Sequence, residues 1–535
     1  MTRTRGLLAA ALLVTALFGA LHLDWGLPGA WHPDTKVPLV LRMAANKSLD
    51  PDYFINPSFH LYLTGACLAP YAGLLMVRGE LPRPQTLHAA PEWFLTGVFL
   101  IGRALSVLMS VLTAWATYLL GRRLADERAG LLAAWGYAVT LGAMNLAHFA
   151  TPETTLTFLM TMTLVKVLDV IVEGRRRDFW LAGLFLGLAL STKYTALVLV
   201  PFVGLAPFLR HGARSTMPWK CAAISLSVAL VAFLVTTPYA LLDFGTFWKH
   251  FQFALAAQTT YRGFTFEEAQ WLPTLGHFAD LFGWPLWIAC LGGLLFGIVN
   301  AVRCSERRLW LVIGYIVLTY VLLGRAHLSA MRYAFPVAPA MLALMSAGTV
   351  ALLDRGQRIR TAVKAGIFFV LAFSAVNCCA GLWIFARESR YEAGTWIREH
   401  VEPGATVGFF AGYHDESTGE TFPDAWLLPL EIDLRYPDRQ YTVTFLPEIE
   451  DKSASIDSLR ARLRDDGPEY LLLARDDYRR YFDYDDYPER RAFYRDLLDG
   501  DLGYERAARF HPAPSWWLPI ELELVNPELE ALRRR

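Results

Sequence analysis

The sequence predicts a polytopic α-helical membrane protein with about eleven spans and a small α/β domain at its C-terminal end. Three observations support this fold class. The 535 residues are 54% hydrophobic with a mean hydropathy of +0.30, and the 19% charged residues fall short of what soluble proteins carry. Apolar stretches of roughly 20 residues, enough to cross a bilayer, recur through residues 1–385. From Glu388 onward the composition is that of a soluble domain, so we expect an extracytoplasmic α/β domain over residues 386–535.

Charge and cysteine content exclude several classes of protein. The 50 basic and 50 acidic residues cancel, which argues against a nucleic-acid binder. The six Cys all precede residue 380 and their spacing fits no zinc or redox motif. No His-x-x-His, Asp-x-Asp or Walker-type pattern is present. We therefore expect chemistry without a metal ion or a cofactor.

The spans are placed by apolar length. The first begins after the basic residues Arg3 and Arg5; no small-x-small cleavage site precedes a soluble domain, so a retained span is expected rather than a signal peptide. The expected spans cover residues 6–23, 94–120, 129–147, 154–172, 179–190, 193–209, 221–238, 284–301, 309–323, 335–352 and 362–385. The short pair 179–190 and 193–209 predicts a tight hairpin around Lys193.

Basic residues predict the orientation, because cytoplasmic connectors carry an excess of Lys and Arg. The basic connectors hold Arg3/Arg5, Arg122/Arg123/Arg128, Arg175/Arg176/Arg177, Arg210/Arg214/Lys220, Arg303/Arg307/Arg308 and Arg355/Arg358/Arg360/Lys364. With a cytoplasmic N-terminus these alternate correctly only if residues 58–77 do not cross the membrane. That apolar stretch contains Pro70 and Gly73, and we expect a helix along the interface within a long outer loop, 24–93. A second long outer loop is expected at 239–283.

Four elements are expected in the C-terminal domain. Helical spacing predicts helices at 391–400 and 456–463, and short apolar runs predict strands within 401–410 and at 470–474. The Tyr-rich stretch 478–494 is interpreted either as a carbohydrate-contacting surface or as a solvated helix.

Asp34 is the main candidate for chemistry. It lies at the predicted membrane boundary with His32, Pro33 and Lys36 beside it, where an ionisable residue is costly and usually functional. A carboxylate there could act as a general base, or it could cap the helix that follows. Glu153, after Pro152, is a second acid on the same face; it could assist or merely favour a helix N-terminus.

Motifs along the chain resemble those of a known family. They are Trp31-His-Pro-Asp34, Leu41-Arg-Met-Ala44, Pro51-Asp-Tyr-Phe54, Asn56-Pro-Ser-Phe59, Arg103-Ala-Leu-Ser106, His148-Phe-Ala-Thr-Pro-Glu153, Gly187-Leu-Ala-Leu-Ser-Thr-Lys-Tyr194, Thr237-Pro-Tyr239, Arg332-Tyr-Ala-Phe-Pro336 and Tyr391-Glu-Ala-Gly-Thr-Trp-Ile397. In this order the chain resembles the C-type (GT-C) glycosyltransferases. It is most similar to the family 39 group, which contains protein O-mannosyltransferases and lipid A aminoarabinose transferases.

The resemblance implies an integral membrane enzyme that takes a sugar from a polyprenyl-phosphate carrier. A carboxylate of the first outer loop, here Asp34, would be the base, and Glu153 would help it. The sequence departs from the family at two points: Asp34 is followed by Thr35 where two adjacent acids are common, and Glu153 stands where Asp is usual. Asp34 would therefore act alone.

The remaining candidates fall into two groups. Those expected to hold the donor phosphate are Lys193, Arg262, His327 and Arg332; those expected to line the site or contact the acceptor are His32, Lys36, Asn56, His148 and Tyr239. Arg332 could instead reach lipid headgroups, and the loop around Arg262 could close over the carrier or rest as an aromatic belt.

These features predict an inverting glycosyltransferase of the bacterial inner membrane, with its site and C-terminal domain outside the cytoplasm. The expected partners are membrane lipid, a polyprenyl-phosphate-linked hexose or pentose, and a hydroxyl acceptor on protein, lipid or glycan. Two alternatives remain: a flippase or transporter for polyprenyl-linked glycans, which would need polar residues at mid-membrane and matching halves, and a catalytically inactive relative.

Overall fold

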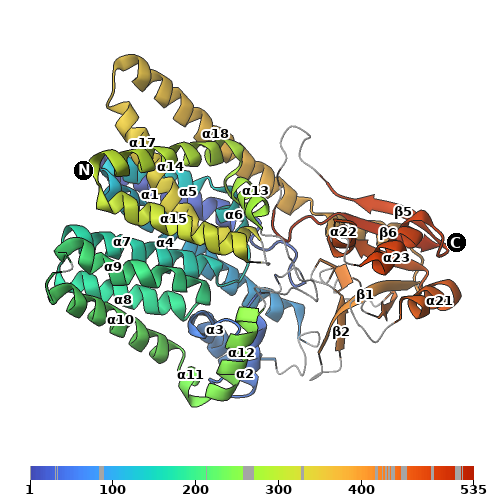
Figure 1. The fold of residues 1–535 in the computed structure, drawn as a ribbon. Coiled ribbons are helices and arrows are strands. Elements are labelled where there is room, and N and C mark those ends of the chain that lie inside the picture. The colour runs from blue at the N-terminus through green and yellow to red at the C-terminus, as the bar shows by residue number, and fades with distance from the viewer. Residues whose placement is uncertain are drawn as a thin grey trace.

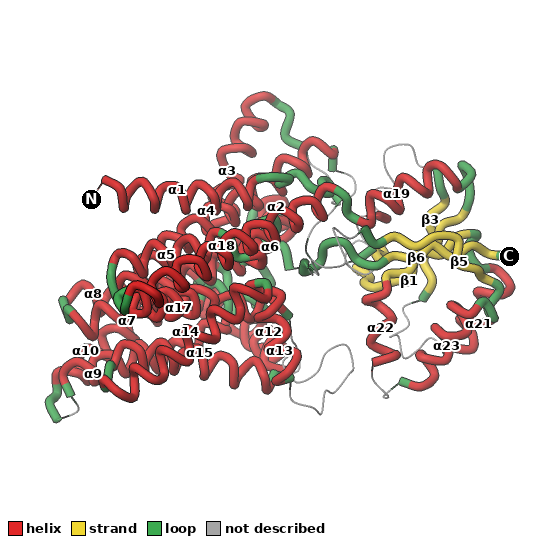
Figure 2. The backbone as a smooth tube through the Cα atoms, turned by 90° about the horizontal axis from the view of Figure 1, so that it is seen from above, coloured by secondary structure: helices red, strands yellow, loops and turns green. Residues whose placement is uncertain are grey.

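The protein consists of a helical bundle and a sheet-containing C-terminal part (Figure 1). The structure is a computed structural model that describes residues 2–29, 32, 34–82, 90–212, 214–256, 270–326, 330–415, 420–423, 426–427, 430–431, 434, 440–447, 455–483, 487–512, 520 and 522–535. In Figure 2 the strands lie to one side of the helices, so the two predicted parts are spatially distinct.

The helices of the bundle follow the predicted spans closely. They are α1 (Thr2–Ala20), α2 (Val37–Ala45), α3 (Phe59–Arg78), α4 (Glu92–Leu124), α5 (Glu127–Ala138), α6 (Leu141–Ala147), α7 (Glu153–Val172), α8 (Arg176–Leu190), η2 (Tyr194–Leu199), α9 (Val200–His211), α10 (Met217–Thr236), α11 (Tyr239–Leu242), α12 (Phe244–Ala256), α13 (Trp271–Phe282), α14 (Trp284–Cys304), α15 (Arg307–Arg325), α16 (Met331–Ala334), η3 (Phe335–Val337), α17 (Ala338–Leu353) and α18 (Gln357–Ala386).

Among the described residues, nine helices are long and apolar enough to cross a membrane, or ten if α5 and α6, which bend by 58°, form one span. Every predicted span coincides with a helix. Those at 6–23 and 179–190 correspond to the shorter helices α1 and α8, and α3 joins the candidates by length and composition. The predicted fold class, a polytopic helical membrane protein, is confirmed.

The contacts of α3 agree with a helix along the interface. The Phe59 N–H donates to the Ser191 carbonyl, after α8, at 2.9 Å, and the Tyr71 ring, twelve residues later, stacks on Phe94 in the first turn of α4. Both neighbours lie at the same end of the bundle. Figure 2 likewise shows α3 running across the direction of α1 and α4. The interfacial position of α3 stays a prediction, because α3 is also long and apolar enough to cross a membrane.

The basic connectors gather at the opposite end, called here the basic end. The Arg308 guanidinium donates to the Arg123 carbonyl at 2.9 Å, and Arg210 donates to the Ile171 carbonyl at 2.9 Å. Arg128 forms a two-bond ion pair with Asp354 at 2.8 and 2.9 Å. Connectors that the sequence predicted to share one side of the membrane therefore interlock. The bonds of Arg210 also bring α9 back beside the end of α7, as the predicted hairpin requires.

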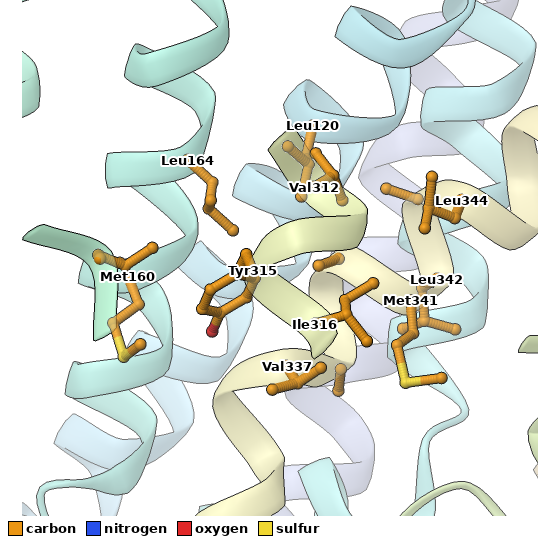
Figure 3. Packing of buried hydrophobic residues seen from close by; sticks show 14 of the residues in the cluster. Leu120, Met160, Leu164, Val312, Tyr315, Ile316, Val337, Met341, Leu342 and Leu344 are labelled. Carbon is orange, nitrogen blue, oxygen red and sulfur yellow. The ribbon is translucent and has the colours of Figure 1, made fainter. Parts of the chain in front are cut away.

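Close helix packing fills the centre of the bundle. Side chains from α4, α7, α15 and α17 interdigitate there, as Figure 3 shows for Leu120, Leu164, Val312 and Leu344. The Tyr315 hydroxyl donates to the Pro336 carbonyl at 2.9 Å, which satisfies the one polar atom of this buried ring. Membrane helices associate through such close packing because lipid offers no hydrophobic driving force between them.

The C-terminal part is a small α/β domain, as predicted. Its elements are α19 (Ser389–His400), β1 (Thr406–Asp415), β2 (Glu420–Pro423), β3 (Thr442–Leu446), α21 (Ile456–Asp466), β4 (Tyr470–Ala474), α22 (Arg475–Asp483), α23 (Pro488–Asp499), β5 (Tyr504–Phe510) and β6 (Leu529–Arg534). β3, β1 and β4 are parallel, β6 pairs antiparallel with β4 and with β5, and β2 folds back on the end of β1.

The Tyr-rich stretch 478–494 belongs to the core of this domain. Tyr478, Tyr481 and Tyr494 are buried together with Leu463 and Phe493. Their rings face inward from α22 and α23, while charged neighbours such as Arg479 and Glu489 are exposed, so these helices combine a solvated face with a buried tyrosine face.

The chain does not leave the bundle for good at residue 386. Near its end, Leu522 and Val525 return and pack with Trp25, Phe149 and Phe385. The two parts therefore share a buried cluster at the end of the bundle opposite the basic end. This opposite end is called here the site end.

Candidate active site

Asp34 lies in the connection between α1 and α2, which is fixed to the turn before α7. The Thr35 hydroxyl donates to the Ala150 carbonyl at 2.9 Å, and the Lys36 N–H reaches the same oxygen at 3.3 Å. The residue that caps α2 is Lys36. Asp34 lies two positions before the N-cap of α2. The geometry therefore does not give Asp34 the alternative role of a helix cap.

Among the acids of the site, Asp34 is the accessible one. Its Oδ2 lies 3.2 Å from Nε of Arg332, an ion pair that joins the first loop to α16. The Asp34 side chain is 32% exposed, whereas that of Glu153 is 1% exposed. A substrate arriving from the site end would meet the Asp34 carboxylate first.

His32 links Asp34 to a more distant segment. The Asp34 backbone N–H donates to Nδ1 of His32 at 2.9 Å, so the ring proton of the neutral imidazole belongs on Nε2. That nitrogen lies 3.9 Å from Oε1 of Glu523. The ring also packs edge-on against Phe149 at 5.2 Å between centroids. His32 is thus held by the loop, by the bundle and by the chain near its C-terminal end.

The local field keeps Asp34 ionised. Burial alone would raise the pKa of its carboxyl group, but the positive charges of Arg332, Lys193 and Lys36 together hold that pKa well below its usual range. The site therefore presents a carboxylate rather than a carboxylic acid at neutral pH.

Glu153 and Lys193 form a buried ion pair next to Asp34. The Nζ of Lys193 donates to Oε1 of Glu153 at 2.8 Å. Glu153 is also the first residue of α7, where the helix dipole favours a negative charge, so both roles weighed for it are compatible with its position. A buried charge is costly unless it is paired, which explains why Lys193 accompanies it.

Lys193 and Arg332 share one aromatic ring. The Tyr333 centroid lies 4.9 Å from the Lys193 ammonium and 5.0 Å from the Arg332 guanidinium carbon. The two predicted phosphate-binding cations are therefore brought together from segments about 140 positions apart in the sequence. Lys36 is a third cation, with Nζ 3.2 Å from the Tyr53 hydroxyl.

Of the other predicted site-lining residues, His148 lies away from this cluster. His148 is fully buried: both ring nitrogens lie 2.8 Å from backbone carbonyls, of Met144 and Leu21, and the ring stacks on Phe385. It fixes the end of α1 rather than facing Asp34. Asn56 is buried in the segment before α3, and Tyr239 begins α11. Arg262 and His327 fall outside the described residues.

Sequence reasoning missed Glu523, and nothing around it in the sequence signals a site. Its carboxylate pairs with the Arg332 side chain and accepts the Arg332 backbone N–H at 2.9 Å. Tyr333 was also missed, although it follows Arg332 within a motif that the resemblance relied on. Among the described residues no group of three His, Cys, Asp or Glu side chains could hold a metal ion. The expected independence from metal stays a prediction.

Comparison with known proteins addresses the fold. The chain superposes on the crystal structure of ArnT from Cupriavidus metallidurans bound to undecaprenyl phosphate with a TM-score of 0.53 at 14% identity. The match covers 98% of this chain and 97% of that one. The oligosaccharyltransferase of Archaeoglobus fulgidus gives a TM-score of 0.52 at 14% identity, covering 98% of this chain and 76% of that one. The chain has the fold of a C-type glycosyltransferase.

A family comparison points the same way. Residues 91–241, from α4 to α11, match the family described as dolichyl-phosphate-mannose-protein mannosyltransferase. No curated protein matches the chain. The resemblance to C-type glycosyltransferases drawn from the motifs is confirmed. In this C-type fold the cluster around Asp34 occupies the site end, and the basic connectors occupy the other.

Proposed function

We propose that the protein is an inverting glycosyltransferase that moves a sugar from a polyprenyl-phosphate carrier to a hydroxyl acceptor. The observation that carries this proposal is a single accessible carboxylate, Asp34, set beside the paired cations Lys193 and Arg332 at one end of a C-type bundle. Similar structures support the choice of donor: ArnT is bound to undecaprenyl phosphate, and the archaeal oligosaccharyltransferase has been seen with dolichol phosphate.

Asp34 would act as the general base. An acceptor hydroxyl is a weak nucleophile, and transfer of its proton to Asp34 during attack on the anomeric carbon lowers the barrier. The bond that breaks joins the anomeric carbon to a phosphate oxygen, and its electron pair leaves with the phosphate. Because attack and departure take place on opposite faces of the sugar, one carboxylate suffices and the anomeric configuration inverts.

Lys193 and Arg332 would stabilise the leaving phosphate. Negative charge grows on its oxygens as the bond breaks, and fixed cations in a partly buried site lower the energy of that charge. A guanidinium carries five N–H donors. Among the described residues, the Arg332 side chain pairs with Asp34 through Nε and with Glu523 through one Nη, so its remaining N–H donors can reach a phosphate. This supports binding of the sugar donor's phosphate by Arg332 over simple attachment of its side chain to lipid headgroups.

The orientation follows from the same charges. Basic connectors favour the cytoplasm, so we place the basic end there and the site end, with the C-terminal domain, outside. For a bacterial protein this is the outer face of the inner membrane. Nucleotide sugars are made in the cytoplasm. A site on the other side of the membrane is therefore consistent with a lipid-linked donor.

A transporter of lipid-linked glycan is less well supported. It would place its polar residues near the membrane midplane between related halves. The ion pairs described here gather at the two ends of the bundle, around Asp34 and around Arg123, instead. An inactive relative is excluded only by an assay.

The test is transfer by the purified protein from a panel of polyprenyl-phosphate sugars in detergent, with proton NMR of the product's anomeric centre. We expect transfer from at least one donor, an inverted anomer and inhibition by the free polyprenyl phosphate. A retained configuration would contradict the single-base mechanism. Binding of every carrier without any transfer would favour the transporter or the inactive relative.

A further inference from the structure

We infer that Glu523, close to the C-terminal end of the chain, is a positioning residue of the site. Its carboxylate holds Arg332 and His32 so that the guanidinium stays in ion-pair contact with Asp34 through Nε without clamping both Asp34 oxygens, which leaves the Asp34 carboxylate able to accept from a substrate hydroxyl. This inference deepens the proposed function and rests on it.

The Glu523 side chain is mostly buried and makes several specific contacts. Oε2 accepts the Arg332 backbone N–H at 2.9 Å, Oε1 pairs with an Arg332 Nη, and the same Oε1 faces Nε2 of His32 at 3.9 Å. Its side chain is 10% exposed. Burial alone would raise the pKa of this carboxyl group, but Arg332 and His32 hold that pKa at about 2, so Glu523 stays charged at neutral pH.

The backbone around Glu523 is anchored on both sides. Leu522 and Val525 pack in the buried cluster shared with the bundle. The Leu524 carbonyl accepts from Arg390 at 3.0 Å, and the Asn526 N–H donates to Glu388 at 3.1 Å. A segment fixed in this way places its carboxylate permanently, which distinguishes Glu523 from a passing surface contact.

Removing the Glu523 charge would change what Arg332 does to Asp34. A guanidinium that faces one carboxylate tends to form two parallel N–H···O bonds with it. With Glu523 in place, one Nη is taken up by its carboxylate, and the ion pair of Arg332 with Asp34 runs through Nε, at 3.2 Å. Without it, the fork would turn to Asp34, engage both oxygens and weaken the base.

Glu523 also supplies a second carboxylate that the first loop lacks. Thr35 follows Asp34 where the resembled family commonly has a second acid, and the Thr35 hydroxyl is bound to the Ala150 carbonyl. The second carboxylate beside Arg332 comes from the other end of the chain. The C-terminal domain therefore contributes a residue to the chemistry of the bundle as well as covering it.

The test compares Glu523→Gln with Glu528→Gln. Glu528 is a matched control because it is a similarly buried acid, 13% exposed, that pairs with Arg475 and Arg509 away from the site. We expect Glu523→Gln to lower kcat by about tenfold or more, but by no more than the 10²–10⁴-fold contribution of general-base catalysis as a whole, without weakening the binding of polyprenyl phosphate. Glu528→Gln should keep both values.

A double variant separates positioning from general support of the fold. Arg332→Lys keeps the charge but removes the planar guanidinium fork that could turn from Glu523 to Asp34. If Glu523 acts through Arg332, Glu523→Gln should cost less than about threefold more in the Arg332→Lys background, because coupled residues are not additive. Melting in detergent checks that each variant is folded.

Three results would overturn the inference: a Glu523→Gln variant with wild-type kcat, a loss of the same size in both backgrounds, or polyprenyl-phosphate binding that falls with the charge. The proposed function fails separately, through absence of transfer by the wild type. In that event the binding measurement remains a test, because a loss of polyprenyl-phosphate binding in Glu523→Gln would still overturn the inference.

Discussion

At the scale of single residues, the account depends on the balance of charge around Asp34. Three carboxylates, Asp34, Glu153 and Glu523, share their surroundings with Lys36, Lys193 and Arg332. Cations outweigh burial at Asp34 and lower its pKa. The lowered pKa makes Asp34 a weaker base, but its carboxyl group is ionised at every pH at which the protein is expected to work. Its position in the site compensates for the weaker basicity.

Arg332→Gln should therefore change the pH dependence of transfer. A carboxylate with a lowered pKa is ionised above that pKa and loses activity only when acid protonates it. Without the guanidinium the pKa of Asp34 rises, and the acid limb of kcat/KM should move upward by roughly 1 to 3 pH units. Profiles extended from pH 8 down to about pH 3 measure this. Arg128→Gln, which removes an ion-paired Arg at the basic end, is the control.

An acid limb at the same pH in wild type and Arg332→Gln would mean that another group sets it. A limb that moves equally in Arg128→Gln would point to a general loss of stability instead.

Residue types and motif order predicted a large share of the candidate site. Asp34, His32, Lys36, Glu153, Lys193 and Arg332 were all predicted and the fold brings them together. Glu523 could not be predicted, because its role arises from the return of residues 522–526 to the bundle, which no local pattern encodes. His148 was predicted as site-lining and lies in the same motif as Glu153, yet its neighbours make it a buried link between helices.

At the scale of elements, close helix contacts fix the bundle around the site. Gly293 in α14 lies against α17 so closely that an added Cβ would overlap the backbone of Met345, whereas Gly292 next to it has open space. Small residues of this kind let membrane helices approach.

Gly293→Ala should destabilise the protein by ~1–3 kcal/mol, the usual cost of overpacking, and lower its melting temperature in detergent. Gly292→Ala is the control on the same helix and should melt at the wild-type temperature or slightly above, because Ala favours helix. Equal melting of both variants would show that α14 and α17 are not packed as described.

Elements with a long apolar signal were predicted well, and elements made by pairing were not. Every expected span has its helix because lipid demands a run of apolar residues. β6, by contrast, has the sequence Leu-Glu-Ala-Leu-Arg-Arg, composed of good helix formers, and it is a strand because β4 and β5 flank it. No local reading reveals such partners, and the sequence analysis assigned no element there.

At the scale of the whole molecule, the two ends of the bundle carry different chemistry. Arg-rich connectors interlock at the basic end, and the ionised cluster lies at the site end with the C-terminal domain over it (Figure 1). This polarity is the physical basis for the proposed orientation.

Reporter fusions in a bacterial host test that orientation. Alkaline phosphatase, which is active only outside the cytoplasm, should be active when fused after Arg535 and inactive when fused after Arg175 in the α7–α8 connector. The reverse pattern would place the site end in the cytoplasm and contradict a donor used at the outer face.

The most direct test of the central claim is sugar transfer by Asp34→Asn beside Asp52→Asn. Asp52 lies in the same first loop, is exposed and has a positive φ of 46°, which Asn tolerates, so it matches the change without touching the site. We expect Asp34→Asn to lose transfer by about 10²–10⁴-fold while still binding polyprenyl phosphate, and Asp52→Asn to match wild type. Full transfer by Asp34→Asn would contradict its role as base and direct attention to Glu153.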